Sequence, residues 1–174
     1  MELDSSEKIE AILNYEAWSE DAKYGLRISS QILRKMINIC RKVKVIETGG
    51  IIVGYYNRKR DCAIVTDCSG PPKDSKHGKN YFYRGIQGLQ NWINKLWYLG
   101  QRRYYLGEWH FHPFGNPKPS DVDEKQIKEN SENKSYKCPE PLMIIIGCKA
   151  NETFICNSFV YVKQKGLIEL RRKE

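Results

Sequence analysis

The sequence has few histidines, no paired cysteines and no long apolar run. Only three of the 174 residues are histidine, and the six cysteines include no Cys-x-x-Cys pair. Neither a disulfide framework nor a cysteine zinc site is therefore expected. The chain also lacks an apolar run close to the length that spans a bilayer, and it lacks a charged-then-apolar N-terminal signal. These absences predict a cytoplasmic protein with reduced, mostly buried thiols and no membrane partner.

The composition of the chain fits one compact domain with an uneven charge. Hydrophobic residues make up 40% and charged residues 29% of the chain, which is ordinary for a globular domain of this length. Residues 1–22 carry seven acidic side chains and one lysine, whereas the rest carries 28 basic and 14 acidic side chains. We therefore expect an acidic N-terminal segment at 1–22, a main domain at 23–165 and a basic tail at 166–174. The acidic segment could fold onto the basic body, or the body could meet an acidic partner. Nucleic-acid binding is not favoured, because the basic residues form no aromatic-basic motif.

Two of the three histidines stand close to a carboxylate and a hydroxyl group. His110 and His112 flank Phe111, and alternate residues of an extended segment project from the same face. Ser120 and Asp123 have the spacing of a first helical turn, which makes them neighbours. Two imidazole nitrogens and one carboxylate oxygen suit zinc, and three protein ligands leave a fourth position open. This pattern predicts a hydrolytic zinc site.

Such a site also needs a carboxylate that does not bind the metal and that can accept and return a proton. Glu47 is the candidate. It follows the basic segment 41–46 and precedes the β-branched run 48–56, which reads as a buried strand. The strand is entered through Gly49 and Gly50, and residues without a side chain allow close approach of a neighbouring backbone.

Together these residues resemble the JAB/MPN metalloproteases, whose pattern is an upstream Glu, then His-x-His, seven residues, Ser, two residues and Asp. The whole pattern stands in this chain as Glu47, His110, His112, Ser120 and Asp123. The flanks look like the bacterial branch of integrative elements and CBASS antiphage operons, which is similar to deubiquitinases. The segments that carry this likeness are 47–50, 69–75, 82–85 and 105–109.

The resemblance implies a role for each residue. Zinc would be held by His110, His112 and Asp123. Glu47 would be the general base and then the acid, and Ser120 would donate a hydrogen bond to the oxyanion. The activity implied is that of an isopeptidase or peptidase, which separates the extended C-terminal tail of a ubiquitin-like or otherwise conjugated protein from an amine. The setting implied is antiviral defence, with a nucleotide cyclase as one conjugated partner. The alternatives are a processing peptidase for linear precursors of ubiquitin-like or sulfur-carrier proteins, and a non-catalytic MPN scaffold.

Four residues of this region carry open alternatives. Phe111 departs from the Ser or Thr of eukaryotic deubiquitinases, but it should face away from the metal and so affect substrate choice. Glu108 alternates in phase with the two histidines, so it could support them or could be a surface carboxylate at a strand end. His77 lies among polar loop residues and is expected to be an exposed histidine, not a ligand. Ser120 also fits an ordinary capping box.

Periodicity predicts a mixture of helices and strands. The expected helices are 28–40 with a serine cap, 82–99 with a Trp and Leu stripe in the core, and a short helix from Ser120. The expected strands are 50–56 and 62–68 as an antiparallel hairpin, 104–112, 142–148, 153–159 and 160–163. Residues 128–137 are expected to form a surface loop. We expect a single three-layer α/β/α domain around a mixed sheet, the cytidine-deaminase-like architecture that the JAB/MPN resemblance implies.

Overall fold

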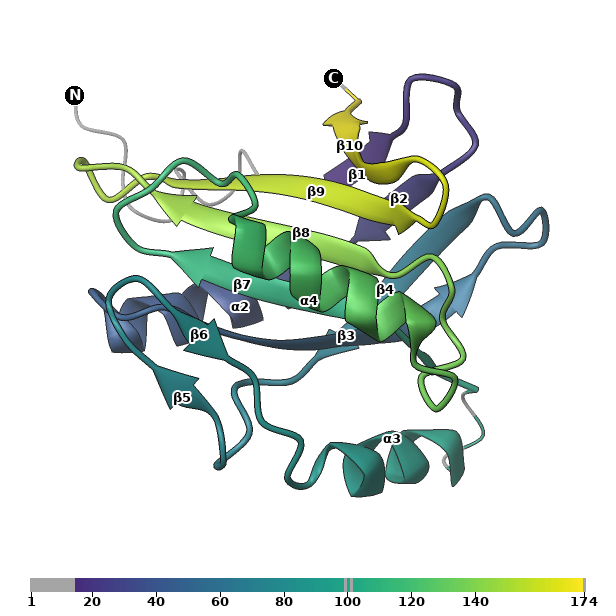
Figure 1. The fold of residues 1–174 in the computed structure, drawn as a ribbon, viewed down its shortest axis with the longest axis horizontal. Helices are drawn as coiled ribbons and strands as arrows, with labels where there is room; N and C mark the ends of the chain where they lie inside the picture. Colours follow the sequence, from purple (N-terminus) through teal and green to yellow (C-terminus); the bar gives the residue numbers. More distant parts are fainter. Residues whose placement is uncertain (1–14, 99, 101, 174) are drawn as a thin grey trace.

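The computed structural model describes residues 15–98, 100 and 102–173 (Figure 1). The strands are β1 Tyr15–Trp18, β2 Gly25–Ile28, β3 Thr48–Tyr56, β4 Cys62–Cys68, β5 Lys76–His77, β6 Phe82–Tyr83, β7 Tyr104–His112, β8 Leu142–Cys148, β9 Phe154–Val162 and β10 Gly166–Arg172. The helices are α2 Ser30–Val43, α3 Leu89–Tyr98 and α4 Asp121–Glu132.

Eight of the strands form one closed, barrel-like sheet in the order β1-β10-β9-β8-β7-β3-β4-β2. The β2/β4 and β7/β8 pairs are parallel and the other pairs are antiparallel. The predicted α/β class and the mixed sheet are confirmed. The predicted three-layer arrangement is not observed, because β1 and β2 bridge β10 to β4 and close the sheet on itself.

The two short strands near the N-terminus and the last strand were not expected from the sequence. β1 and β2 have four residues each, which is too short for a clear alternation of apolar and polar side chains. β1 pairs with β10, so strands from the segments predicted at 1–22 and 166–174 belong to the same sheet as the main domain. Most of the segment 1–22 lies outside the described residues.

The described part of the acidic segment contacts basic side chains of the body. Glu16 forms ion pairs with Arg27 at 2.9 Å and with Lys173 at 3.5 Å. Asp21 lies 3.8 Å from Lys165. Solvent screens these exposed pairs, so they add little stability, and β1 is held mainly by its sheet hydrogen bonds and buried side chains.

Helices α2 and α4 cover opposite faces of the strands β7 and β8 (Figure 1). α2 contributes to the largest core cluster, which includes Trp109 and Phe111 of β7. On the other face, Ile127 of α4 packs against Met143 and Ile145 of β8. The alternation of side chains along β7 therefore divides the strand between a core face toward α2 and a second face toward α4.

The helix α2 follows its prediction closely. The side chain of Ser29 caps it by accepting a hydrogen bond from the backbone N–H of Ile32. Its buried residues are the ones whose spacing predicted the helix: Ile32, Leu33, Met36, Ile37 and Cys40. The antiparallel hairpin of β3 and β4 is also confirmed.

The predicted helix at 82–99 is wrong in its first part, because the helix begins at Leu89 and its first predicted residues form β6. The carboxylate of Asp74 accepts hydrogen bonds from the backbone N–H groups of Ile86 and Gln87, which holds this stretch as a loop. Gly88 then adopts a φ of +83°, a left-handed conformation that an α-helix does not contain.

The apolar stripe of α3 lies at the margin of the core. Leu89, Ile93 and Leu96 are partly buried against a small cluster built from β3 and β7. Ile86 is 69% exposed and Trp97 is 43% exposed. The expectation that these two residues belong to the core is therefore wrong. The helix is amphipathic, but the neighbouring sheet covers only part of its apolar side.

Two further predictions needed correction near the C-terminus. The strands expected at 153–159 and 160–163 are one continuous strand, β9. The surface loop expected at 128–137 begins later, since α4 continues to Glu132 and buries Asn130.

The predicted free thiols are confirmed: all six cysteines are free, and four of them are buried. Among the described residues, no helix has the length and apolar character needed to cross a membrane.

Candidate metal centre

The strand β7 directs its side chains to two faces. Trp109 and Phe111 are buried in the core cluster beneath α2, so Phe111 faces away from the two histidines as expected. His110 and His112 lie on the other face, toward α4. The same face receives Glu108, which is in phase with both histidines along the strand.

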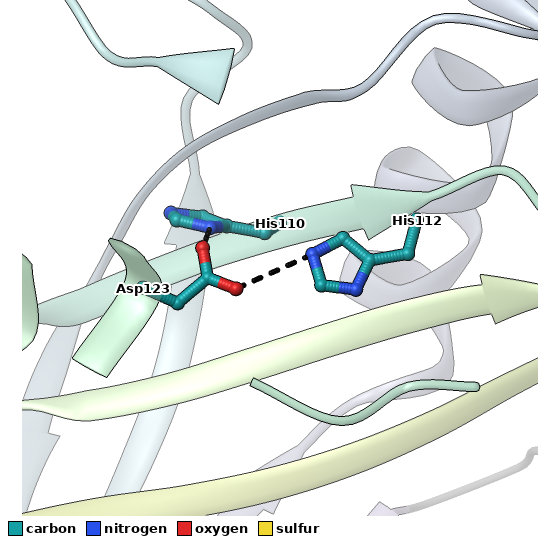
Figure 2. A group of neighbouring side chains, drawn as sticks. All are labelled: His110, His112 and Asp123. Atoms are coloured by element: carbon teal, nitrogen blue, oxygen red, sulfur yellow. Dashed lines mark hydrogen bonds and ion pairs between the residues drawn. The ribbon is translucent and has the colours of Figure 1, made fainter. Parts of the chain in front are cut away.

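Figure 2 shows Asp123 of α4 between the two histidines of β7. The Nδ1 atom of His110 lies 2.8 Å from Asp123 Oδ1, and the Nε2 atom of His112 lies 3.5 Å from Asp123 Oδ2. The three residues offer ligand atoms that all lie within 4.8 Å of one another. His110 is buried and His112 is partly exposed, so the cluster is accessible from one side.

Asp123 is placed by the N-terminus of α4. Ser120 is the N-cap, and its Oγ accepts a hydrogen bond from the backbone N–H of Asp123. The Asp123 carboxylate in turn accepts hydrogen bonds from the Ser120 N–H at 2.7 Å and from the Ser120 hydroxyl at 2.8 Å. The alternative of an ordinary capping box is therefore also true, and the cap fixes the carboxylate beside the histidines.

The donor set fits a zinc ion, because two imidazole nitrogens and one carboxylate oxygen converge on one small space. Burial alone would raise the pKa of Asp123, but hydrogen bonds from His110 and His112 hold that pKa well below its usual range. Burial acts to lower the pKa of His110, yet its hydrogen bonds to Asp123 and Glu108 raise it to about 9. The site is thus organised around a carboxylate that stays ionised and favours cations.

Glu47 lies at the edge of this cluster. It immediately precedes β3, in which Thr48 pairs with Phe111 and Gly49 pairs with His110. Burial raises the pKa of the Glu47 carboxyl, and the neighbouring charge of His112 opposes that rise. A carboxyl with a raised pKa accepts a proton more readily than an exposed carboxyl does.

The glycine at the start of β3 allows this arrangement. A Cβ on Gly49 would overlap the backbone oxygen of Trp109 and approach the ring of Phe82 to 2.8 Å. The expected close approach of backbones is therefore confirmed at this position. Phe82 itself stands edge-on to the His110 ring, with 5.6 Å between ring centroids.

The small hairpin of β5 and β6 holds the backbone of Glu47. The Glu47 N–H donates to the carbonyl oxygen of Gly78, and the Nδ1 atom of His77 lies 2.9 Å from the Glu47 carbonyl oxygen. His77 is partly buried and contacts the ring of Phe82. The expectation that His77 is exposed is corrected. His77 is not part of the His110, His112 and Asp123 group.

Glu108 is not the surface carboxylate that the sequence left open. It is 1% exposed and contacts His110, Arg84 and Asn130. The sequence missed Arg84 and Asn130, which lie 24 residues before and 22 residues after it. The one local signal was the phase of Glu108 with the histidines, which placed it on their face of the strand.

The fold and this cluster define the class of the protein. The family model of prokaryotic homologs of the JAB domain matches residues 29–160, and the chain belongs to this family. The resemblance inferred from the five-residue pattern is confirmed.

Among curated proteins, the chain is similar to a CD-NTase/cGAS isopeptidase of Enterobacter hormaechei subsp. hoffmannii (strain UCI 50). The two are 37% identical over 153 residues, which cover 88% of this chain and 84% of that protein. Among solved structures, the solution structure of protein DSY2949 from Desulfitobacterium hafniense matches with a TM-score of 0.60 and 18% identity. That match covers 82% of this chain and 87% of the other, and it supports the fold alone.

Proposed function

We propose that this protein is a zinc-dependent isopeptidase of the deubiquitinase-like kind that acts in a CBASS-like antiphage system. It cleaves the bond between the C-terminal tail of a conjugated protein and an amine. The observation that carries the proposal is the convergence of His110, His112 and Asp123, with Glu47 at the edge of the same cluster. The relative named as a CD-NTase/cGAS isopeptidase supports the same chemistry.

The proposed metal ligands are His110, His112 and Asp123. Zinc bound there supplies Lewis acidity, which makes a water nucleophile available at neutral pH. The ligands themselves are held from two elements, because β7 carries both histidines and the cap of α4 carries Asp123. Two rigid elements keep such ligand atoms in place better than loops do.

Glu47 is the proposed general base and acid. Its raised pKa lets the carboxylate take a proton from the attacking water and deliver it to the leaving amine. The contacts of its backbone with Gly78 and His77 hold this residue at the start of β3, beside the proposed ligands.

Ser120 is the proposed donor to the oxyanion. Its hydroxyl donates to Asp123 at 2.8 Å, beside the two histidines. To serve the oxyanion, the hydroxyl must rotate from this carboxylate toward the substrate, while its oxygen continues to cap α4. A single oxyanion donor is typically worth about 3–4 kcal/mol of barrier.

The proposed substrate is a nucleotidyltransferase of the CD-NTase/cGAS kind whose C-terminal tail is joined to a lysine side chain. A test uses two substrates with one tail, the first fused linearly to a reporter and the second joined to a lysine ε-amine. The proposed groups act on the scissile carbonyl and do not distinguish an α-amine from a lysine ε-amine as the leaving group. Both substrates should therefore be cleaved. Cleavage of the linear fusion alone would contradict the isopeptidase proposal and favour the alternative of a processing peptidase.

The remaining alternative is an MPN scaffold that binds a partner without catalysis. Glu47→Gln separates the two, since a scaffold binds equally well with either residue and has no turnover to lose. Binding of a tail peptide by both forms, without hydrolysis by the wild-type protein loaded with zinc, would support the scaffold.

A further inference from the structure

A buried carboxylate stands directly behind one of the proposed metal ligands. Glu108 is 1% exposed, and its Oε2 atom lies 3.2 Å from the Nε2 atom of His110. The other ring nitrogen of His110, Nδ1, faces Asp123 at 2.8 Å. The imidazole is therefore held between two carboxylates, one on each nitrogen.

The two oxygens of Glu108 have different partners. Oε1 accepts hydrogen bonds from Arg84 Nε at 2.8 Å and from Asn130 Nδ2 at 2.7 Å, and the Tyr105 hydroxyl lies 3.5 Å away. Oε2 has His110 as its partner. One oxygen thus anchors the carboxylate in the fold, while the second is directed at the imidazole.

We propose that Glu108 is a positioning residue that fixes the ring of His110, with the proton on Nε2 and with Nδ1 turned toward His112 and Asp123. A carboxylate only accepts hydrogen bonds, so a ring nitrogen that faces one carries a proton, and this holds for Nε2 beside Glu108 and for Nδ1 beside Asp123. Nδ1 faces the other proposed ligands, so a metal bound there would replace the Nδ1 proton, while the hydrogen bond to Glu108 keeps the proton on Nε2. This inference rests on the proposed zinc site.

The two anchoring partners, Arg84 and Asn130, tie Glu108 to two other parts of the fold. Arg84 follows the strand β6, and its side chain is 3% exposed, so the pair is fully buried. Asn130 lies on α4, seven residues after Asp123, which is two helical turns and the same face of the helix. A shift of α4 would therefore displace Asn130 and Asp123 together, and Glu108 couples both to β7.

The backbone of β7 is adapted to bring Glu108 into this position. The pairing of β3 with β7 shifts between Ile52, which pairs with Gly107, and Val53, which pairs with Tyr105. The residue between them on β7, Leu106, has no partner on β3, and Gly107 adopts a φ of +145°. A Cβ on Gly107 would overlap the backbone of Leu142. The irregularity lets both Tyr105 and Glu108 face the same side, although they are three residues apart.

The variant Glu108→Gln tests the proposal. All four partners of the carboxylate are donors, so the amide NH₂ of glutamine must face a donor in either orientation. We expect the affinity for zinc, measured by competition with a chelator, to fall about 10- to 100-fold. Long-range ¹H–¹⁵N spectra of the zinc-loaded protein should place the proton of His110 on Nε2 in the wild type, and the variant should lose this pattern. Only three histidines need assignment.

A double variant separates positioning from loss of the fold. Glu108→Gln leaves the buried Arg84 without its charged partner, which destabilises the protein by itself. Glu108→Met combined with Arg84→Met removes both charges, so thermal stability should recover while the zinc affinity stays reduced. Recovery of the affinity together with the stability would overturn the proposal.

Tyr15→Phe is the matched control. It removes a buried hydrogen bond to Ser158 at 2.9 Å that has no part in the site, so its zinc affinity should equal that of the wild type. Unchanged zinc affinity and an unchanged His110 pattern in Glu108→Gln would also overturn the proposal. These measurements do not depend on hydrolysis, so a wild-type protein that binds zinc but cleaves no conjugate would contradict the proposed function alone.

Discussion

At the scale of single residues, each group of the metal centre depends on a neighbour for its position. Asp123 is held by both the N–H and the hydroxyl of Ser120. His110 is held by Glu108, and the backbone of Glu47 is held by the β5–β6 hairpin. Hydrogen bonds to charged groups are strong and directional. Substitutions of these neighbouring residues should therefore change turnover or zinc affinity, depending on which group the residue holds.

The first prediction concerns Glu47→Gln, which keeps the size of the side chain but cannot take up a proton. The variant should retain zinc, because Glu47 is not one of the clustered ligands, and should lose about 100- to 10,000-fold in turnover. Elemental analysis and single-turnover cleavage of a lysine-linked tail measure the two effects. Glu20→Gln is the control, since that side chain is 83% exposed and remote from the chemistry. Turnover within a few-fold of wild type would remove Glu47 from the mechanism.

The second prediction separates the two roles of Ser120. Ser120→Ala removes the cap of α4 and should lower the free energy of unfolding by about 1 kcal/mol, whereas Ser120→Gly should lower it by only a few tenths. Both variants lack the hydroxyl, so both should lose turnover to a similar extent, by about 100- to 1,000-fold. Urea unfolding and steady-state kinetics measure the two effects. If turnover follows stability across the pair, Ser120 acts only as a cap.

At the scale of elements, the site is built where β3, β7 and α4 meet, and the approach of β3 to β7 depends on the absence of a side chain at Gly49. The backbone oxygen of Trp109 and the ring of Phe82 occupy the space that a Cβ would need. Phe82 in turn packs edge-on against His110. A change in the spacing of these two strands is therefore transmitted to the metal site.

The third prediction is that Gly49→Ala destabilises the protein by about 1–3 kcal/mol, the usual cost of overpacking, and also weakens zinc binding. Gly70→Ala is the matched control: its nearest neighbour, Ile39, lies at an ordinary 3.7 Å, and no positive φ opposes the substitution. Thermal unfolding and chelator competition on both variants give the comparison. Equal stability of the two variants would contradict the packing argument.

At the scale of the whole molecule, the closed sheet and its core clusters support the fold without a metal. The largest cluster joins α2 to the inward side chains of strands from both ends of the chain. The site lies on the opposite face of β7, beside a smaller cluster under α4. A metal bound at this site would therefore stabilise a structure that already has its own core.

The fourth prediction is that a chelator lowers the melting temperature but leaves a cooperatively folded sheet. Ligand at about 1,000 times its dissociation constant adds about 4 kcal/mol to the stability of the native state. Far-UV circular dichroism and calorimetry with and without zinc measure this shift. His110→Ala combined with His112→Ala should unfold at the same temperature under both conditions. Loss of the sheet on chelation would show that the metal is part of the folding core.

Much of the local structure could be predicted from the sequence. The spacing of apolar residues located α2, β3, β4, β7 and β8, because a side chain's face on a helix or strand depends only on its position along that element. The same argument placed His110 and His112 on one face and Phe111 on the other. The helix-capping pattern placed Asp123 beside Ser120. The ligand roles of His110, His112 and Asp123 and the catalytic roles of Glu47 and Ser120 remain predictions.

What only the tertiary structure decided involves residues that are far apart in the chain. The barrel closes through short strands whose pairing partners, such as β10 for β1, have no local signature. Arg84 and Asn130 meet Glu108 across more than 20 residues in each direction. Local patterns specify the face on which a side chain lies, but its partner there depends on how distant segments pack. For this reason the sequence alone indicated the proposed metal ligands, and the tertiary structure revealed the buried carboxylate that is in contact with one of them.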